Sequence, residues 1–320
     1  MKLSRKIMDK IMTKTKHFFI INPKAGKINI YEKIHKEIKE VFKDSNEEYK
    51  IYVTKEKYDA TSYTKSICES EEGNLRFYAC GGDGTLNEVV NGLIGYTNAS
   101  VSVIPYGTGN DFINNFKSKF RFYDISKQIN FNKEKIDLLK VNDIYSVNLC
   151  NIGFDAKVAE NMDRFKRFPL ISGQGAYTIS IFYSLFHKMY NNLDIIIDNK
   201  ELIHGDFLLC VVANGMTYGG GYKGTPLAKI NDGLIDICII KKVSRLKLIK
   251  LINIYKVGNH LENKEIRDYF IYRKCKSINI KSNDNFTACI DGEIVINKNI
   301  NISLESKSIN FLVPHKDIVY

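Results

Sequence analysis

Short apolar runs alternate with segments of helical periodicity over the first third of the sequence, and this alternation constrains the fold more than any other feature. The apolar runs predict strands at His17–Ile21, Tyr49–Val53, Leu75–Cys80 and Val101–Ile104. Helices are predicted between them, over residues 30–43, 57–70 and 85–94. Strands that alternate with helices through short links predict a parallel sheet with crossover helices.

The pattern changes at about residue 140, where strand-like segments follow one another. They are Tyr145–Cys150, Leu193–Asp198, Phe207–Val212, Leu234–Ile240, Ser277–Lys281, Phe286–Ile290 and Ile300–Leu304. Helical periodicity interrupts this series at residues 173–190 and 244–257. The series predicts a mainly antiparallel second domain, either a sandwich or a distorted barrel. A chain of 320 residues has room for both domains.

The chain is basic, with a formal net charge of +11. Such a balance suits an anionic partner, which includes a nucleic acid, a nucleotide or an acidic membrane surface. Much of the excess lies in residues 1–16, where Leu3, Ile7 and Ile11 also recur every four residues. This basic N-terminal extension fits either a solvated terminus or a helix that lies on a membrane surface.

No apolar run approaches the ~20 residues needed to cross a bilayer, and no uninterrupted apolar stretch suits a signal peptide. The seven cysteines show no C-x-x-C spacing, and most lie in apolar runs. We therefore expect a soluble cytoplasmic protein with reduced, buried thiols. The six histidines form no H-x-x-x-H pair, so no zinc site is expected.

The strongest local signal is the segment Gly81–Glu88, which reads GGDGTLNE and lies between a predicted strand and a predicted helix. Its glycines let the main chain approach a ligand closely, and the helix N-terminus attracts phosphate. Asp83 is unusual beside phosphates unless a cation such as Mg²⁺ accompanies them. A tight turn without a ligand also explains part of the pattern, because Thr85 and Glu88 have capping-box spacing.

Two further glycine loops follow predicted strands of the same domain, at Asn22–Lys27 and Pro105–Asp111. Either loop alone is an ordinary turn. Ligands of open parallel sheets bind at the carboxyl ends of the strands, so we expect all three loops to converge. Lys24, Thr108 and Asn110 are then available for phosphate or ribose. Neither a Walker A pattern nor G-x-G-x-x-G is present.

The second domain carries two Asp-Gly turns with more than one reading. Ile290–Glu293 is an ordinary hairpin signal, but Glu293 on a defined turn also suits a general base. Asn231–Asp236 poses the same choice. It is either a turn or a place where Asp232 and main-chain carbonyls hold a hard cation.

The ordered motifs resemble the diacylglycerol kinase catalytic domain family, which includes bacterial lipid kinases and the sphingosine and ceramide kinases. The three glycine loops match the family as Asn-Pro-x-x-Gly, Gly-Gly-Asp-Gly-Thr-x-Asn-Glu and Pro-x-Gly-Thr-x-Asn-Asp-Phe. The resemblance covers about residues 17 to 315. Later matching segments are Gly153–Ala156, Ala213–Gly215, Gly219–Gly221, Pro226–Ala228, Asp232–Leu234 and Asp291–Glu293.

The resemblance implies an α/β N-terminal domain similar to that of NAD kinases and phosphofructokinases, and a C-terminal antiparallel β-sandwich. The active site is expected in the interdomain cleft, and the last strand, Ile309–Val313, is expected to return to the first domain. The expected nucleotide-binding domain comprises residues 17–139 and 307–320. Residues 140–306 form the expected lipid-substrate domain.

The resemblance also implies ATP and Mg²⁺ as cofactors. Asp83 corresponds to the carboxylate at the catalytic Mg²⁺, Glu293 to the general base and Asp291 to its support. Asp232, with the carbonyls of Lys229 and Leu234, corresponds to a structural Mg²⁺ site. The implied nucleotide contacts are Asn22, Pro23, Lys24, Ala25, Gly26, Thr54, Gly81, Gly82, Asp83, Gly84, Thr85, Leu86, Asn87, Glu88, Thr108 and Asn110.

The expected activity is ATP-dependent phosphorylation of a lipid hydroxyl at the inner face of the cell membrane, with diacylglycerol as the first choice of substrate. Phosphatidylglycerol, a sphingoid base or a soluble substrate such as NAD are alternatives, and so is an inactive nucleotide- or lipid-binding module. The family includes dimers, so a homodimer is open. A nucleic-acid binder is the weakest hypothesis, because the charge is dispersed and no recognised motif is present.

Two segments bear on access to a lipid. Residues 173–190 predict an apolar helix that is either core or an acyl pocket. Residues 241–256 combine basic and apolar side chains, which suits either an ordinary half-buried helix or membrane docking. The sequence departs from the family at Ala25, where serine is common, and at Ile113-Asn114, where Ala-Arg is common. These departures bear on substrate detail more than on catalysis.

Overall fold

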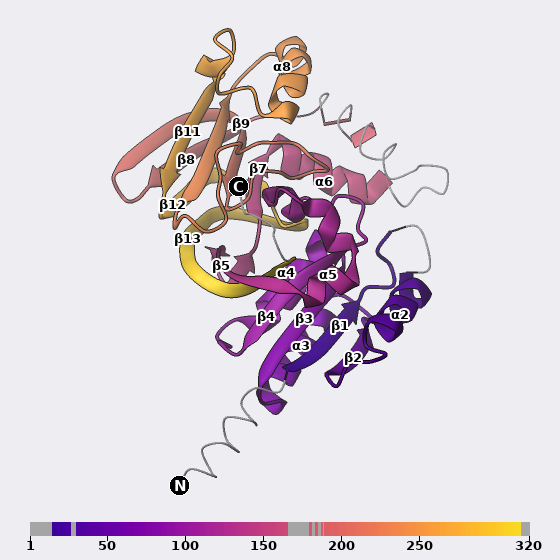
Figure 1. The fold of residues 1–320 in the computed structure, drawn as a ribbon. Coiled ribbons are helices and arrows are strands. Elements are labelled where there is room, and N and C mark those ends of the chain that lie inside the picture. The colour runs from indigo at the N-terminus through magenta and orange to yellow at the C-terminus, as the bar shows by residue number, and fades with distance from the viewer. Residues whose placement is uncertain are drawn as a thin grey trace. The chain divides into compact units, whose positions relative to one another are not determined.

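The protein was analysed as a computed structural model that describes residues 15–26, 30–165, 179–180, 183–184, 187 and 189–314. The chain divides into two compact units (Figure 1). The first unit comprises Met1–Asp137 and Ser306–Tyr320, and the second comprises Leu138–Glu305. The expected basic extension and most of the predicted helix at 173–190 lie outside the described residues.

The first unit is built on a parallel sheet in the order β2-β1-β3-β4. Its strands are β1 (Thr15–Ile21), β2 (Glu48–Val53), β3 (Asn74–Gly81) and β4 (Ala99–Pro105). The links contain α2 (Ile30–Val41), α3 (Asp59–Ser70) and α4 (Asp83–Leu93). Strands β1, β3 and β4 are almost continuously buried, as expected for parallel strands covered on both faces. The predicted α/β domain is confirmed.

The end of the last strand, β13 (Glu293–Pro314), completes this sheet, because Phe311 pairs in parallel with Val101 of β4. Phe311 lies in an aromatic cluster, with ring centroids 5.2 Å from Phe112 and 5.5 Å from Phe116. The segment between β4 and β5 (Phe131–Val141) supplies those rings. It forms the 3₁₀ helices Phe112–Asn115 and Lys119–Tyr123, followed by α5 (Ile125–Ile129).

The second unit is mainly antiparallel, as the sequence predicts. Besides β13 it contains β6 (Ile144–Ser146), β7 (Leu149–Gly153), β8 (Asn191–Ile197), β9 (Glu201–Ala213), β10 (Ile235–Lys241), β11 (Phe270–Cys275) and β12 (Ser277–Ile290). Its helices include α6 (Phe154–Phe165), α8 (Arg245–Val257) and the 3₁₀ helix Arg267–Tyr269.

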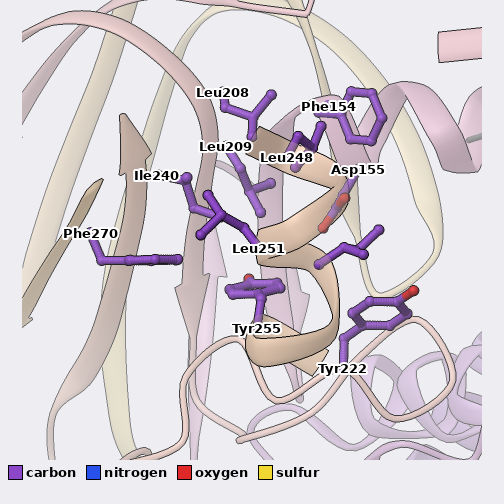
Figure 2. Close-up of a pocket in the computed structure, with 11 residues that line it drawn as sticks. Phe154, Asp155, Leu208, Leu209, Tyr222, Ile240, Leu248, Leu251, Tyr255 and Phe270 are labelled. Atoms are coloured by element: carbon purple, nitrogen blue, oxygen red, sulfur yellow. The ribbon is translucent and has the colours of Figure 1, made fainter. Parts of the chain in front are cut away.

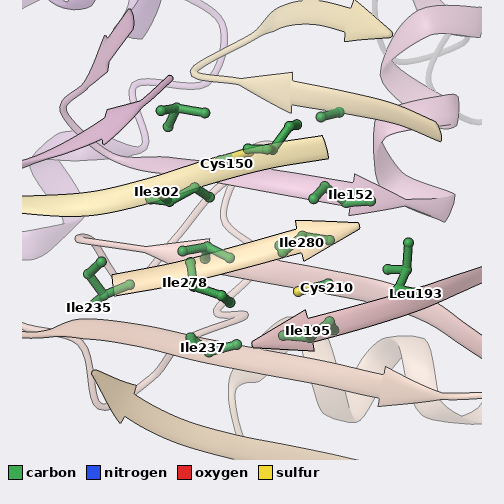
Figure 3. Close-up of a cluster of buried hydrophobic side chains, with 14 of the residues drawn as sticks. Cys150, Ile152, Leu193, Ile195, Cys210, Ile235, Ile237, Ile278, Ile280 and Ile302 are labelled. Carbon is green, nitrogen blue, oxygen red and sulfur yellow. The ribbon is translucent and has the colours of Figure 1, made fainter. Parts of the chain in front are cut away.

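The long strands β9 and β12 each pair with β7 near one end and with β8 near the other. The strands therefore wrap around a shared apolar interior and form the predicted β-sandwich. Isoleucines dominate this interior, and Figure 3 shows Ile195, Ile278 and Ile302 among them. A second cluster lies where α6 and α8 cover the sheet, with Val158, Leu248 and Leu251 among its members.

Several strand boundaries differ from the sequence reading. The predicted strand Tyr145–Cys150 is wrong as a single element, because β6 ends at Ser146 and β7 begins at Leu149. The two predicted strands Ser277–Lys281 and Phe286–Ile290 are one strand, β12, whose pairing with β13 shifts register between them. The polar segment at the shift breaks the apolar alternation without ending the strand.

All seven cysteines are buried free thiols, as predicted. Burial raises the pKa of the Cys68 and Cys210 thiols to about 12, so both are protonated at neutral pH and unreactive. In the part of the chain that the structure describes, no helix is long and apolar enough to span a membrane.

Candidate functional site

Three glycine loops of the first unit meet at the carboxyl ends of β1, β3 and β4. The amide of Asn22 in the first loop donates to Thr85 Oγ1 in the second, at 3.2 Å. The backbone N–H groups of Tyr106 and Gly107 in the third loop donate to the Gly81 carbonyl, at 2.8 and 3.2 Å. The three loops therefore converge, as the sequence predicts, and present main-chain groups at the N-terminus of α4.

Glycine is required where the second and third loops touch. A methyl group added to Gly107 would lie 2.4 Å from Gly82 Cα, which is far inside van der Waals contact. At Gly26, where φ is +76°, a methyl group would lie 2.7 Å from the Tyr106 carbonyl oxygen. Side chains at these positions would push the loops apart, so the glycines allow the close approach of the three main chains.

Asp83, the first residue of α4, fastens the third loop to the second. Its Oδ2 accepts the N–H of Asp111 at 2.8 Å, and its Oδ1 accepts the N–H of Phe112 at 3.0 Å. Burial raises the pKa of this carboxyl, and the backbone donors act in the opposite direction. The structure thus gives a carboxylate among these glycines a positioning role that does not depend on a cation.

The carboxylates at this edge also fit a cation that arrives with phosphates. A methyl group on Gly109 would lie 3.5 Å from Asp83 Oδ2 and 3.2 Å from Asp111 Oδ2, so two carboxylates flank this glycine. Over the described residues, no cluster of three or more His, Cys, Asp or Glu side chains suits a metal ion. Mg²⁺ usually takes one or two carboxylates and completes its shell with phosphates and water. The sequence reading did not assign Asp111, although it stands in the third motif.

The other predicted nucleotide contacts divide into exposed and buried groups. Lys24 and Thr108 are exposed, and Asn110 is half-buried with a left-handed φ of 52°. The Asn110 amide donates to the Gly107 carbonyl at 2.8 Å, while its Oδ1 is buried and finds no hydrogen-bond partner among the described residues. That oxygen is a candidate acceptor for a ligand hydroxyl or amine.

The remaining predicted nucleotide contacts differ in how far their side chains are exposed. Pro23, Ala25, Gly84 and Glu88 are exposed or half-buried around the loops, whereas Thr54, Thr85 and Asn87 are largely buried. Leu86 is fully buried and its N–H donates to the Gly82 carbonyl. Its side chain belongs to the core, so it supports the loop without reaching a nucleotide.

Asp291 and Glu293 occupy the turn between β12 and β13 in the second unit. Asp291 and Gly292 have φ values of 44° and 94°, which makes this a tight hairpin turn. The Asp291 carboxylate accepts backbone N–H groups from Val147 at 2.7 Å and from Leu149 at 2.9 Å. These bonds explain why the predicted strand 145–150 breaks there. They also fix the turn from which the half-buried Glu293 begins β13.

Asp232 is ion-paired in the structure. Its Oδ1 accepts the Leu234 N–H at 3.1 Å, and its Oδ2 lies 2.9 Å from the Lys274 ammonium. Lys274 also lies 3.1 Å from Asp236 Oδ2. A cation is therefore already supplied to this turn by the protein. Mg²⁺ at Asp232 with the carbonyls of Lys229 and Leu234 stays a prediction, and it has to share or displace this lysine.

A polar group that sequence reasoning missed lies in an apolar pocket of the second unit (Figure 2). The carboxylate of Asp155, at the start of α6, accepts a hydrogen bond from the Tyr218 hydroxyl, which also bonds the Tyr255 hydroxyl at 2.9 Å. Leucine and aromatic side chains from β9, α8 and β11 make up most of the lining. The signal was present in the matching segment Gly153–Ala156, but nothing in the sequence showed that its carboxylate faces apolar surroundings.

Burial raises the pKa of the Asp155 carboxyl to about 6, against the bond from Tyr218, which lowers it. The folded state then holds a proton that the unfolded chain has lost. The stability from this group is therefore complete below pH 3.8 and declines as the pH rises to about 6.

The unfolding free energy of the wild-type protein should fall between about pH 4 and pH 6, and in Asp155→Asn this fall should be smaller by about 2 to 3 kcal/mol. The reason is that a difference of one pKa unit is worth ~1.4 kcal/mol. Asp291, whose pKa burial raises to about 6, contributes a fall of the same sign that the variant retains. Urea titrations across this pH range measure the difference. An unchanged pH dependence in the variant contradicts the assignment.

Both units match family models of known proteins. Residues 16–141 match the diacylglycerol kinase catalytic domain, and residues 148–313 match the YegS C-terminal NAD kinase beta sandwich-like domain. Together the matched domains define a two-domain kinase, and its curated relatives include proteins named diacylglycerol kinase. The chain belongs to the diacylglycerol kinase catalytic domain family, which confirms the resemblance seen in its motifs.

Individual relatives agree. The chain is 30% identical over 281 residues to a diacylglycerol kinase of Staphylococcus carnosus, covering 86% of this chain and 87% of the relative. It is 29% identical over 279 residues to the diacylglycerol kinase of Bacillus subtilis, covering 86% and 88%. A crystal structure of a diacylglycerol kinase from Bacillus anthracis shares the fold with a TM-score of 0.70 at 23% identity, covering 93% and 96%.

Proposed function

We propose that the protein transfers the γ-phosphate of ATP to the hydroxyl of a membrane lipid, with diacylglycerol as the acceptor and phosphatidic acid as the product. One observation carries the proposal above the others. Asp83 joins two glycine loops by hydrogen bonds at a helix N-terminus, in a chain that belongs to the diacylglycerol kinase catalytic domain family. That arrangement suits phosphoryl transfer, which depends on positioning and electrostatic stabilisation.

The nucleotide is assigned to the first unit. The converging loops offer main-chain N–H groups to the phosphates, and the N-terminus of α4 adds a favourable dipole. Lys24, Thr108 and Asn110 surround them with side chains suited to phosphate or ribose. Asp83, with Asp111 beside it, would hold Mg²⁺, which when bound neutralises charge on the phosphates. Asp83 thus serves both the loop geometry and the cation.

The proton step is assigned to Glu293. Its carboxylate accepts the proton of the lipid hydroxyl as that oxygen bonds to the γ-phosphorus and the bond to the β-phosphate oxygen breaks, which releases ADP. Asp291 positions this group, because its own oxygens are held by the backbone of residues 147–149. Residues 140–306 form the lipid-substrate domain in this proposal, and residues 17–139 with 307–320 form the nucleotide domain. In this proposal, the transfer of phosphate to the lipid takes place at the inner face of the cell membrane.

Labelled lipid products test the proposal. With ATP labelled at the γ-position and Mg²⁺, dispersions containing diacylglycerol should yield labelled phosphatidic acid faster than panels with phosphatidylglycerol or a sphingoid base yield their phosphates. Transfer to NAD and not to any lipid would assign the protein to soluble substrates. Nucleotide binding without transfer to any acceptor would instead support an inactive binding module.

A further inference from the structure

Helix α8 of the second unit presents a face that mixes exposed apolar and basic side chains. Leu246, Ile249 and Val257 are 77%, 53% and 56% exposed, respectively. They recur at helical spacing along one side, with Asn253 between them. The opposite side carries Leu248, Leu251 and Tyr255, which are buried in the core of the unit. The fold therefore buries one face of α8, whose place in the ribbon is labelled in Figure 1, and leaves the opposite face exposed.

The charged residues of the segment that carries this face all have the same sign. Every charged residue from Lys241 to Val257 is basic, and the set comprises Lys241, Lys242, Arg245, Lys247, Lys250 and Lys256. Lys242 is partly neutralised by Asp206 at 3.1 Å, and Lys247 lies over the Tyr269 ring. Arg245 and Lys250 are exposed next to Leu246 and Ile249. The exposed face of α8 is thus apolar along its middle and cationic along its edges.

The helix is a well-defined element. Ser244 caps its start by accepting the Lys247 N–H at 3.3 Å, and Gly258 ends it with a left-handed φ of 85°. A rigid helix that exposes leucine and isoleucine carries a solvation cost that folding does not remove. Apolar side chains that penetrate the headgroup region, flanked by cations that meet anionic headgroups, would remove that cost.

We propose that the exposed face of α8 docks the protein on an anionic lipid surface, with Leu246 and Ile249 entering the headgroup region. The inference rests on the proposed function, because it locates the surface through which the kinase would reach a membrane-held substrate. Charge complementarity favours an anionic membrane over a second copy of this basic chain, whose matching face would bring like charges together.

The test compares Leu246→Glu/Ile249→Glu with the wild-type protein in sedimentation with vesicles of phosphatidylglycerol and phosphatidylcholine. The variant should bind at least about tenfold more weakly, because it removes two apolar anchors and adds two like charges. Leu202→Glu/Ile296→Glu is the matched control, since it adds the same two charges and these side chains are 62% and 63% exposed on β9 and β13 of the same unit. The control variant should bind the vesicles as tightly as the wild-type protein does, and added salt should release both proteins from the vesicles.

A second measurement separates docking from catalysis. With a short-chain diacylglycerol dissolved as monomers, the double variant should phosphorylate as fast as the wild-type protein and lose rate only when the substrate is in vesicles. Unchanged vesicle binding of the double variant overturns the docking surface and leaves the kinase proposal standing. If the wild-type protein binds pure phosphatidylcholine vesicles as strongly as anionic vesicles, the docking surface is also overturned. A change from dimer to monomer without loss of vesicle binding overturns it in favour of a second copy.

If the wild-type protein docks through α8 and phosphorylates no lipid, the docking surface stands and the kinase proposal fails.

Discussion

Glu293→Gln should lower the rate of phosphate transfer to lipid by about 10²- to 10⁴-fold, the range that a positioned base contributes. Glutamine keeps the shape of the side chain at the start of β13 but cannot accept the hydroxyl proton. Because the proposal assigns the nucleotide to the loops of the first unit, ATP binding should be unchanged. Single-turnover transfer and equilibrium dialysis with ATP measure the two quantities separately.

Glu201→Gln is the matched control for that variant. Glu201 opens β9 in the same unit and pairs with Arg273 at 3.0 Å, so this substitution also removes one exposed carboxylate charge. It should leave transfer within about twofold of the wild-type rate, as expected for a surface ion pair. A Glu293→Gln enzyme that is as active as this control excludes the role of general base.

Asp83→Asn should lower kcat/KM for ATP by at least about 10²-fold, comparable to the loss of one preorganised contact at an active site. An asparagine side chain turns an NH₂ group toward either the Asp111 N–H or the Phe112 N–H, so one of the two hydrogen bonds from these N–H groups to residue 83 is lost. The negative charge offered to Mg²⁺ disappears as well. Unlike Glu293→Gln, this change should also weaken binding of ATP with Mg²⁺.

Asp198→Asn separates the loss of a carboxylate from the loss of this particular one. Asp198 lies in the second unit and, like Asp83, accepts two backbone N–H groups, from Lys276 and Ser277, both at 2.9 Å. Its substitution should leave ATP binding unchanged. If Asp83→Asn binds ATP with Mg²⁺ as tightly as Asp198→Asn does, Asp83 does not serve the nucleotide.

The order of elements in the first unit could be predicted from sequence because its strands are continuous apolar runs separated by helical periodicity. Buried strands such as β3 and β4 leave little ambiguity once the intervening helices are recognised. Strands in which polar residues interrupt the apolar run could not be predicted in this way. In β5 most of the first half is polar, and the buried apolar side chains are those of Ile136, Leu138, Leu139 and Val141.

Long-range hydrogen bonds explain what the sequence could not show in the second unit. The break between β6 and β7 depends on Asp291, which lies more than 140 positions away and captures the N–H groups of Val147 and Leu149. The continuity of β12 depends on its partners β8 and β7, not on its own alternation. Local propensity carries no information about either partner.

The candidate site shows the same division. The convergence of the three loops follows from the parallel direction of the strands that they leave, which the sequence predicts. The hydrogen bonds of Asp83 to the third loop, the flanking carboxylate of Asp111 and the ion pair between Lys274 and Asp232 require coordinates, because each joins residues from different loops or strands. Asp155 was visible as part of a motif, but its apolar surroundings come from β9, α8 and β11.

The stereochemistry of transfer tests the central claim most directly. If Glu293 only removes a proton while the lipid oxygen displaces ADP, the reaction is a single in-line displacement at the γ-phosphorus. ATP made chiral with three oxygen isotopes at that phosphorus should then give phosphatidic acid with inverted configuration. Retention of configuration would indicate two displacements through a phosphorylated side chain and would contradict the account.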